Sequence, residues 1–211
     1  METKIIIFET GKEEGIMSTN PKFYSKETTI EEIQKQFLKV RKNVVKKHNI
    51  DAKKIVMAHQ KNDNNLLEYK DGKYIVIKEE YFTKNDYWYI DLQTDILILP
   101  EKIKNIIVGH QMSDCPILII EDRKLGVTAI SHCGAAYINR YLPRQTVEAL
   151  EKEYGSQPEN LYVYIGSHIH KENYIYDTYP KWATNEDVWK NNIIKKEKGY
   201  HIDMTSAIKT Q

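Results

Sequence analysis

Two apolar runs near the middle of the chain constrain its fold more than any other feature. The runs cover residues 116–120 and 126–130, and the polar residues 121–124 separate them. Because they are almost wholly apolar instead of alternating with polar residues, each predicts a strand that is buried on both faces. The short polar connection predicts that the two strands pair as a hairpin inside a layered domain.

Helices and strands interleave along the rest of the chain. The hydrophobic pattern predicts strands at residues 5–8, 54–59, 74–77, 87–92, 95–99, 106–108 and 161–165. It predicts helices at residues 28–48, 135–154 and 182–195, with a kink or a restart of the second helix at Pro143. Thr28 and Thr29 before Glu31 and Glu32 form a helix-start signal. These elements indicate a layered α/β (α+β) fold with a mixed sheet.

Length and composition favour one domain and exclude some classes of partner. We expect a single domain over residues 1–211, since neither a repeat nor a linker divides the 211 residues. The 31 Lys and Arg against 30 Asp and Glu give a net charge of +1, which argues against a strongly basic nucleic-acid binder. The sequence contains no run of about 18 apolar residues and no signal-peptide pattern, so we expect no membrane partner. Cys115 and Cys133 are then expected to be reduced thiols in a cytoplasmic protein.

The predicted hairpin brings two reactive side chains to one end of the sheet. Cys115 directly precedes the first apolar run, and His132 directly follows the second and precedes a predicted helix. A cysteine near a histidine and a helix N-terminus has a lowered pKa, so Cys115 is a candidate thiolate nucleophile or metal ligand. As ligands of one metal, its sulfur and the ring nitrogen of His132 would lie roughly 3–4.5 Å apart. The simpler alternative for Cys115 is a buried apolar residue.

Three further histidines stand in positions that suit ligands, although a lone histidine is more often a satisfied surface or core residue. His59 ends the predicted strand 54–59, while His168 and His170 alternate after Gly166. In a strand, His168 and His170 would face the same side. His48, His110 and His201 carry no motif. No glycine-rich phosphate loop and no nucleophile-elbow pattern is present.

Several of these segments resemble the laccase-domain family, also known as the YfiH-like, polyphenol oxidase or peptidoglycan-editing-factor family. The segments are Asp114-Cys115-Pro116-Ile117-Leu118, Ala129-Ile130-Ser131-His132-Cys133-Gly134 and Tyr164-Ile165-Gly166. They resemble, in the same order and at similar spacing, the family wording A-D-C-x-P, H-A-G-W-R-G and I-G-P-x-I. The match is clearest over residues 94–176.

The resemblance implies a layered α/β fold that is YfiH-like or cytotoxic-necrotizing-factor-like. It implies a metal site, usually zinc, held by two histidines and one cysteine. Cys115 and His132 match two of these ligands, and either His59 replaces the other histidine or that ligand is lost. Implied activities are phosphorolysis of adenosine-type purine nucleosides and adenosine deamination, with copper-dependent oxidation of phenols as an older alternative. Such a three-ligand site leaves one position open for water. Asp114 would orient a ligand or move a proton.

The chain departs from the family wording at positions that bear on these roles. Asn62 stands at the place of the family histidine, three residues after His59, and Ala136 stands at the place of the family arginine. His168 and His170, where the family has other residues, are possible substitute ligands. Arg140 follows Ala136 at the i+4 spacing that shares a helix face, so it can replace the arginine as a phosphate-binding residue.

Three functional interpretations remain open at the level of the sequence. The first is a metal-dependent enzyme, with zinc or copper, that takes a small-molecule nucleoside as its substrate. The second is a non-catalytic relative that acts as a binding module. The third is a metal-free Cys/His hydrolase with Cys115 as nucleophile and His132 as base. If Arg140 is simply a solvated surface residue, deamination should outlast phosphorolysis.

Overall fold

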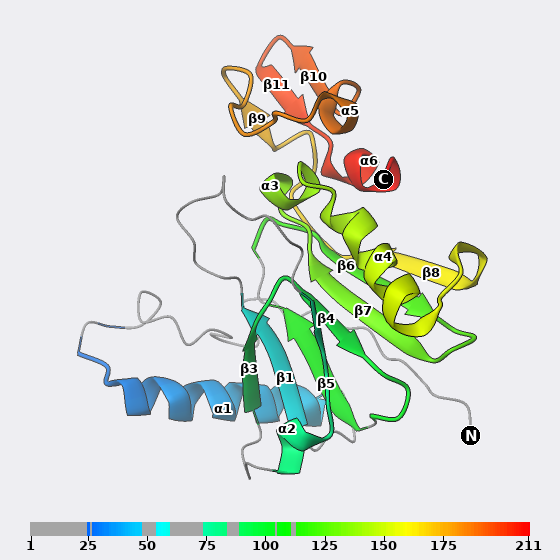
Figure 1. Cartoon of the computed structure of the whole chain (residues 1–211). Helices are drawn as coiled ribbons and strands as arrows, with labels where there is room; N and C mark the ends of the chain where they lie inside the picture. Colours follow the sequence, from blue (N-terminus) through cyan, green and yellow to red (C-terminus); the bar gives the residue numbers. More distant parts are fainter. Residues whose placement is uncertain are drawn as a thin grey trace.

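A computed structural model describes residues 25, 27–47, 54–59, 74–83, 89–103, 105–110 and 113–211 (Figure 1). Its first helix, α1 (Ile30–Lys47), confirms the predicted helix 28–48. Thr29 and Glu32 form a reciprocal cap: the Thr29 amide donates to the Glu32 carboxylate at 2.8 Å, and the Glu32 amide donates to Oγ1 of Thr29 at 3.3 Å. The predicted strand at residues 5–8 lies outside the described residues.

Three parallel strands form the first sheet, in the order β3-β1-β5. They are β1 (Lys54–His59), β3 (Tyr89–Gln93) and β5 (Ile106–His110). Helix α1 packs against one face of this sheet, where Val45 joins a buried cluster with Ile55 and Met57.

Five strands form the second sheet, in the order β2-β4-β7-β6-β8. They are β2 (Tyr74–Val76), β4 (Ile96–Leu99), β6 (Ile117–Asp122), β7 (Val127–His132) and β8 (Leu161–Ile165). Strands β2 and β4 are parallel and the other pairs are antiparallel, which confirms the mixed sheet. The short helix α2 (Glu80–Thr83) follows β2.

The two sheets lie face to face between helices, so the order of layers is helix, sheet, sheet, helix (Figure 1). Alternate residues of β1 point to opposite faces of its sheet. Ile55 and Met57 face α1, whereas Val56 and Ala58 pack with Leu97 of β4 between the two sheets. On the other face of β4, Ile96 and Ile98 join the largest core cluster. Strands buried on both faces need apolar residues at successive positions, which explains the apolar runs.

The central hairpin forms as predicted, but its turn lies two residues later. The strand β6 continues through Glu121 and Asp122, and the turn occupies residues 123–126. Asp122 makes this possible because its carboxylate accepts the amides of Lys124 and Leu125, each at 3.0 Å. Gly126 closes the turn at φ +66°, where its missing side chain avoids a clash with Glu101.

The predicted helix 135–154 is two helices with a break between them. They are α3 (Ala135–Ile138) and α4 (Leu142–Tyr154), and Pro143 lies in the first turn of α4. Tyr141 between them adopts a left-handed conformation at φ +63° and ψ +31°. The chain therefore restarts a helix at Pro143, and α4 covers the outer face of β6 and β7 (Figure 1).

The C-terminal third adds a small antiparallel sheet, in the order β10-β11-β9, beyond the end of β7 at which α3 lies (Figure 1). The strands of this sheet are β9 (Ile175–Tyr176), β10 (Ile193–Lys196) and β11 (Gly199–Ile202). The short helices α5 (Glu186–Trp189) and α6 (Met204–Lys209) accompany it, and the 3-10 helix Pro158–Asn160 precedes β8. The predicted helix 182–195 is therefore mostly wrong, since only Glu186–Trp189 is α-helical. Asn139 ties this part to α3: its side-chain oxygen accepts the Asn185 amide at 3.0 Å and the Trp189 indole at 2.9 Å.

Within the described residues, no helix combines the length and the apolarity that crossing a membrane requires.

We predict that Asp203 stabilises the C-terminal part in a pH-dependent way. Its carboxylate accepts the Ser206 amide at 2.9 Å and the Lys171 ammonium at 2.8 Å. Burial acts to raise the pKa of Asp203, but these bonds and the Lys171 charge outweigh it and lower the pKa. A lowered pKa in the folded state means that the stabilisation is present above the pKa of the unfolded chain and is lost as pH falls. Asp203→Ala should therefore cost about 1 kcal/mol at neutral pH and progressively less below about pH 4.

Urea unfolding of both proteins at neutral and acidic pH measures this difference. Glu197→Ala, an exposed carboxylate in the β10–β11 turn, is the control and should change stability little at either pH. An Asp203→Ala effect that does not vary with pH would contradict the ionic contribution.

Candidate functional site

The pairing of β6 with β7 brings Cys115 and His132 together. Ile117 lies opposite His132 in the register, so Cys115 is only two residues before the start of the paired segment. Directly after the strand, the Cys133 amide donates to the Pro116 carbonyl at 2.9 Å. This bond holds the loop that carries Cys115 against the end of β7.

Gly134 marks the point where the two side chains converge. A Cβ atom built on Gly134 would lie 3.0 Å from Sγ of Cys115 and 3.5 Å from Nε2 of His132. The thiol and the imidazole therefore border the same small space above this residue. A larger residue at position 134 would push against both groups, so glycine suits the close approach.

Burial sets the protonation of both groups in the chain itself. Burial lowers the pKa of His132 to about 4, so its ring is neutral at pH 7. Burial, together with the charge of Asp114, raises the pKa of the Cys115 thiol. The predicted lowering of the Cys115 pKa is therefore wrong, because His132 supplies no positive charge and the adjacent α3 is only one turn long. A bound cation would reverse this balance, since metal ligation favours the thiolate.

His110 and Asp95 also reach this region, and the sequence analysis missed both. The ring centroids of His110 and His132 are 5.7 Å apart. Strand alternation explains the approach: His110 continues the face of Ile106 and Val108, which packs between the two sheets. Asp95 is fully buried just before β4, where its carbonyl accepts the His132 amide at 3.0 Å. The two-residue alternation of a strand, applied to residues 106–110, could have placed His110 on the same face as Ile106 and Val108.

Tyr137 of α3 connects this region to Arg140. Its ring meets the His132 ring edge-on, with centroids 5.4 Å apart. Burial, the charge of Asp95 and a hydrogen bond to that carboxylate raise the pKa of Tyr137 to about 12, and the Arg140 charge acts in the opposite direction. Arg140 is half-buried in the turn after α3, not on the helix itself. Its positive charge therefore lies close enough to influence the tyrosine that touches His132.

Aromatic residues from the C-terminal part border the same end of the sheet. Burial is the main cause of the raised pKa of Tyr174, and the charges of Cys115 and Asp114 add to it, which places this phenol close to the candidate site. The Tyr174 and Tyr176 ring centroids are 5.6 Å apart. Trp182 continues the row, and its indole donates to the Tyr176 hydroxyl at 3.3 Å.

The remaining candidate residues lie around this centre with different orientations. Asp114 is exposed next to Cys115, and its carbonyl accepts the Ile169 amide at 3.0 Å. Both ring nitrogens of His168 are engaged, with the Gly166 carbonyl at 2.7 Å and with Oγ1 of Thr205 at 2.8 Å. The exposed His170 ring stacks on that of His168, with centroids 5.8 Å apart. These bonds hold the His168 ring in place through both of its nitrogens.

A third metal ligand is not assembled among the described side chains, where no group of three His, Cys, Asp or Glu residues is spaced for a metal ion. The backbone still brings further histidines to this end of the first sheet. Ala58 lies opposite His110 in the parallel register of β1 and β5, so His59 and His110 end neighbouring strands at the same end of the sheet. Cys115 and His132 thus lie together in what we call the Cys115–His132 centre, and His59 and His110 end strands at the adjacent end of the first sheet.

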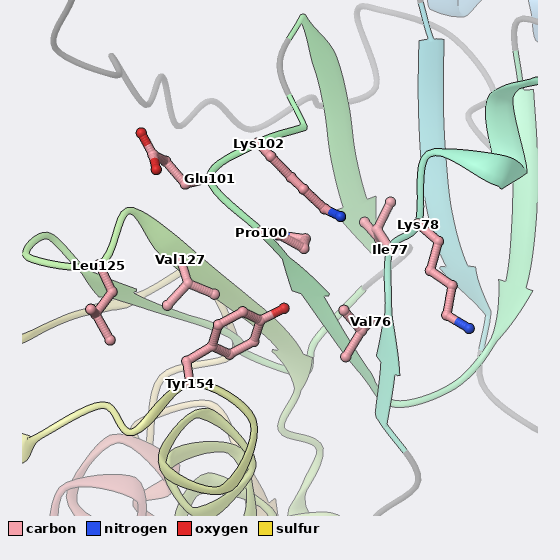
Figure 2. Close-up of a pocket in the computed structure, with 9 residues that line it drawn as sticks. All are labelled: Val76, Ile77, Lys78, Pro100, Glu101, Lys102, Leu125, Val127 and Tyr154. Carbon is pink, nitrogen blue, oxygen red and sulfur yellow. The ribbon is translucent and has the colours of Figure 1, made fainter.

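A separate cavity of about 380 Å³ lies at the opposite end of β7 (Figure 2). It is lined by Val76, Ile77, Lys78, Pro100, Glu101, Lys102, Leu125, Val127 and Tyr154. Val127 begins β7 and His132 ends it, so the two places are about 17 Å apart along the strand. This cavity is therefore not part of the Cys115–His132 centre.

We predict that the Tyr137 hydroxyl stabilises the buried Asp95 carboxylate. Burial and the charge of this carboxylate raise the pKa of Tyr137. Tyr137→Phe removes the polar group that interacts with this fully buried carboxylate and should lower the free energy of unfolding by about 1–3 kcal/mol. Chemical denaturation of the purified variant measures this loss. Tyr179→Phe is the matched control, because Tyr179 is 45% exposed, and it should change stability by less than about 0.5 kcal/mol. Equal effects of the two variants would contradict a stabilising interaction between Tyr137 and Asp95.

Comparison with known proteins identifies relatives of this chain. A family model described as multi-copper polyphenol oxidoreductase laccase matches residues 7–211. A purine nucleoside phosphorylase of Bacteroides thetaiotaomicron is 30% identical over 105 residues, which are 47% of this chain and 38% of that protein.

Two solved structures share the fold. One is the hypothetical protein YfiH of Bacillus licheniformis, with a TM-score of 0.65 at 15% identity over 83% of this chain and 64% of that one. The other is YlmD of Geobacillus stearothermophilus, with a TM-score of 0.66 at 13% identity over 84% of this chain and 64% of that one. The chain thus spans less than two thirds of the length of each of these relatives.

Proposed function

Because the chain belongs to the laccase-like YfiH family, whose model spans residues 7–211, we propose that it is a metal-assisted enzyme acting on purine nucleosides. The observation that carries this proposal is the convergence of the Cys115 thiol and the His132 imidazole over Gly134. A relative that matches about half of the chain is named purine nucleoside phosphorylase, which supports the substrate class.

The two donors suit zinc. A thiolate sulfur and a neutral imidazole are common zinc ligands, and burial already keeps the His132 ring neutral. We propose that His59 or His110, which end neighbouring strands at this edge, supplies a third ligand. When bound in such a site, zinc makes water or a polarised substrate group more reactive near neutral pH. Copper accepts the same donor types and is the alternative metal.

The raised pKa of the Cys115 thiol argues against the metal-free hydrolase. A cysteine nucleophile needs a thiolate, and neither a charged histidine nor a long helix stabilises one here. A neutral His132 could still accept a proton, but burial opposes the charged pair that would result. The same two side chains therefore favour a metal-assisted enzyme over a metal-free hydrolase.

The surroundings of the centre suit a nucleoside and an anion. Tyr137 and Tyr174 border the space near Cys115 and His132, and aromatic rings of this kind can pack against a purine base. Arg140, half-buried next to Tyr137, is the cation we assign to phosphate. We assign the exposed carboxylate of Asp114 to moving a proton to or from the substrate.

Two reactions are open to this arrangement, and Arg140 distinguishes them. In phosphorolysis, a phosphate oxygen bonds to the anomeric carbon of ribose, the bond from that carbon to the base breaks, and the base leaves with a proton. In deamination, the oxygen of water bonds to the carbon that bears the amino group, which leaves as ammonia. Only the first reaction needs a cation that holds phosphate beside the ribose.

We predict about one zinc per chain after purification without chelator, a content that Cys115→Ala should abolish, because a methyl group cannot replace a thiolate ligand. Metal analysis of the dialysed proteins measures the content. Cys133→Ala is the matched control, since Cys133 is fully buried two positions from Ser131 and bonds to its hydroxyl at 3.6 Å. Equal zinc in the Cys115→Ala variant and the wild type would place the metal elsewhere.

We predict that adenosine is cleaved to adenine in the presence of phosphate, and that Arg140→Ala reduces this rate at least about tenfold by removing the phosphate partner. Any conversion of adenosine to inosine should persist in the variant, because it uses water. Chromatography of the products, with and without phosphate, separates the two reactions.

Arg144→Ala is the control for the loss of a positive charge. Arg144 is exposed, with its guanidinium 4.6 Å from the centroid of the Tyr141 ring, and its removal should leave both rates unchanged. Inosine as the sole product would assign deamination to the chain and leave Arg140 without the proposed role. No turnover by the zinc-loaded protein would instead favour a non-catalytic relative, in agreement with Ala136 and Asn62 at family positions.

A further inference from the structure

The strand β8 ends the five-stranded sheet with an unusually apolar surface. Among the strands that the structure describes, its only neighbour is β6. Tyr162, Val163 and Tyr164 are 52%, 57% and 42% exposed, so both faces of this strand reach the surface. An exposed apolar edge strand is a template for pairing with another chain.

The edge strand β10 of the C-terminal sheet is protected in a way that β8 is not. Ile194 of β10 is 43% exposed, but Lys195 and Lys196 follow it on the same edge strand. Lysine on an edge strand discourages pairing with a second sheet. β8 (Leu161–Ile165) contains neither a charge nor a proline. Unlike β10, β8 therefore carries no residue that discourages pairing with another strand.

The hydrogen-bond pattern shows which backbone groups of β8 point outward. The Gly166 amide donates to the Ile117 carbonyl at 2.8 Å, which makes these two opposite residues a hydrogen-bonded pair. Bonded pairs alternate along an antiparallel ladder, so Tyr164 and Tyr162 direct their backbone groups toward β6. Leu161, Val163 and Ile165 therefore direct their backbone groups away from β6. The Leu161 amide donates to the Pro158 carbonyl, so the amides of Val163 and Ile165 and the three carbonyls are the groups that face outward.

We propose that β8 pairs with β8 of a second copy of this chain, antiparallel and centred on Val163. In this register Val163 lies opposite Val163 of the partner subunit, and Leu161 lies opposite Ile165 of the partner subunit. The outward groups of these residues then form about four backbone hydrogen bonds, because the Leu161 amide of each copy already donates to its own Pro158 carbonyl. The two five-stranded sheets join into one continuous sheet across the dimer.

The sequence of β8 selects a second copy as the occupant. Two-fold symmetry requires a self-complementary surface, and an antiparallel strand meets its partner in reverse order. Leu-Tyr-Val-Tyr-Ile has the same pattern in both directions, so each Tyr162 meets Tyr164 of the partner subunit. These are non-bonded pairs of the ladder, where side chains approach most closely and aromatic pairs stabilise best.

The charges beside β8 do not oppose this pairing. The guanidinium of Arg123 lies 3.6 Å from the centroid of the Tyr162 ring and forms an ion pair with Glu121 at 3.0 Å. Each copy therefore presents a paired charge, not a net charge, next to the tyrosine face. An edge contact of five residues buries less area than a standard interface, so we expect a dimer of micromolar affinity.

Sedimentation velocity over the micromolar range tests the dimer. The wild type should shift from one to two chains as its concentration rises, and Val163→Lys should weaken the dimer at least about tenfold. This variant leaves the bonds of β8 to β6 intact, because Val163 directs its backbone outward. Ile194→Lys is the matched control, since it places the same charge at a similarly exposed edge position, and it should dimerise like the wild type.

Single cysteines test the register. Val163→Cys should form a covalent dimer under mild oxidation, because position 163 faces its own copy at about 5.5 Å between Cα atoms. Leu161→Cys should not, since the two copies of position 161 are about 14 Å apart in this register. The wild type, which contains only the native Cys115 and Cys133, is the reference for background oxidation.

Several outcomes would overturn the proposal. A wild type that stays monomeric at all concentrations excludes the dimer. A dimer that survives Val163→Lys uses another surface. Efficient cross-linking through Leu161→Cys but not Val163→Cys rejects the register. Loss of stability in Val163→Lys without any change of mass would show that Val163 serves the fold of the single chain instead of a dimer.

Discussion

The antiparallel ladder between β6 and β7 determines where the chemistry of this chain can occur. Its register sets Ile117 opposite His132, and the bond from the Cys133 amide to the Pro116 carbonyl closes the ladder at that end. These backbone bonds are buried between layers, so breaking them would leave polar groups without water. Cys115 consequently has little freedom to move away from His132.

The stacking of two sheets adds the second constraint. His110 and His132 come from different sheets, and both point into the space between them, where apolar residues exclude water. Exclusion of water keeps His132 neutral and Cys115 protonated in the chain alone. The same environment strengthens the attraction of a thiolate for a metal cation, so the features that weaken a metal-free nucleophile favour a metal-assisted one.

Local pattern predicted much of this fold, whereas contacts between distant segments did not follow from it. The apolar runs predicted the hairpin, but its turn was misplaced because the Asp122 side chain lets β6 run through two acidic residues. His110 was missed because it reaches His132 through the stacking of one sheet on the other, a contact between distant segments that no local pattern shows. The pKa of Cys115 was predicted in the wrong direction because proximity to His132 is visible in the sequence and burial is not.

Zinc-edge X-ray absorption of the zinc-loaded protein tests the central assignment most directly, because it counts sulfur ligands without assuming an activity. We expect one sulfur at about 2.3 Å, from Cys115, with nitrogen or oxygen ligands at about 2.0–2.1 Å. A shell without sulfur would contradict the assignment of Cys115 as a ligand. A shell with two sulfurs would also contradict it, since Cys133 would then have to leave its buried position beside Ser131.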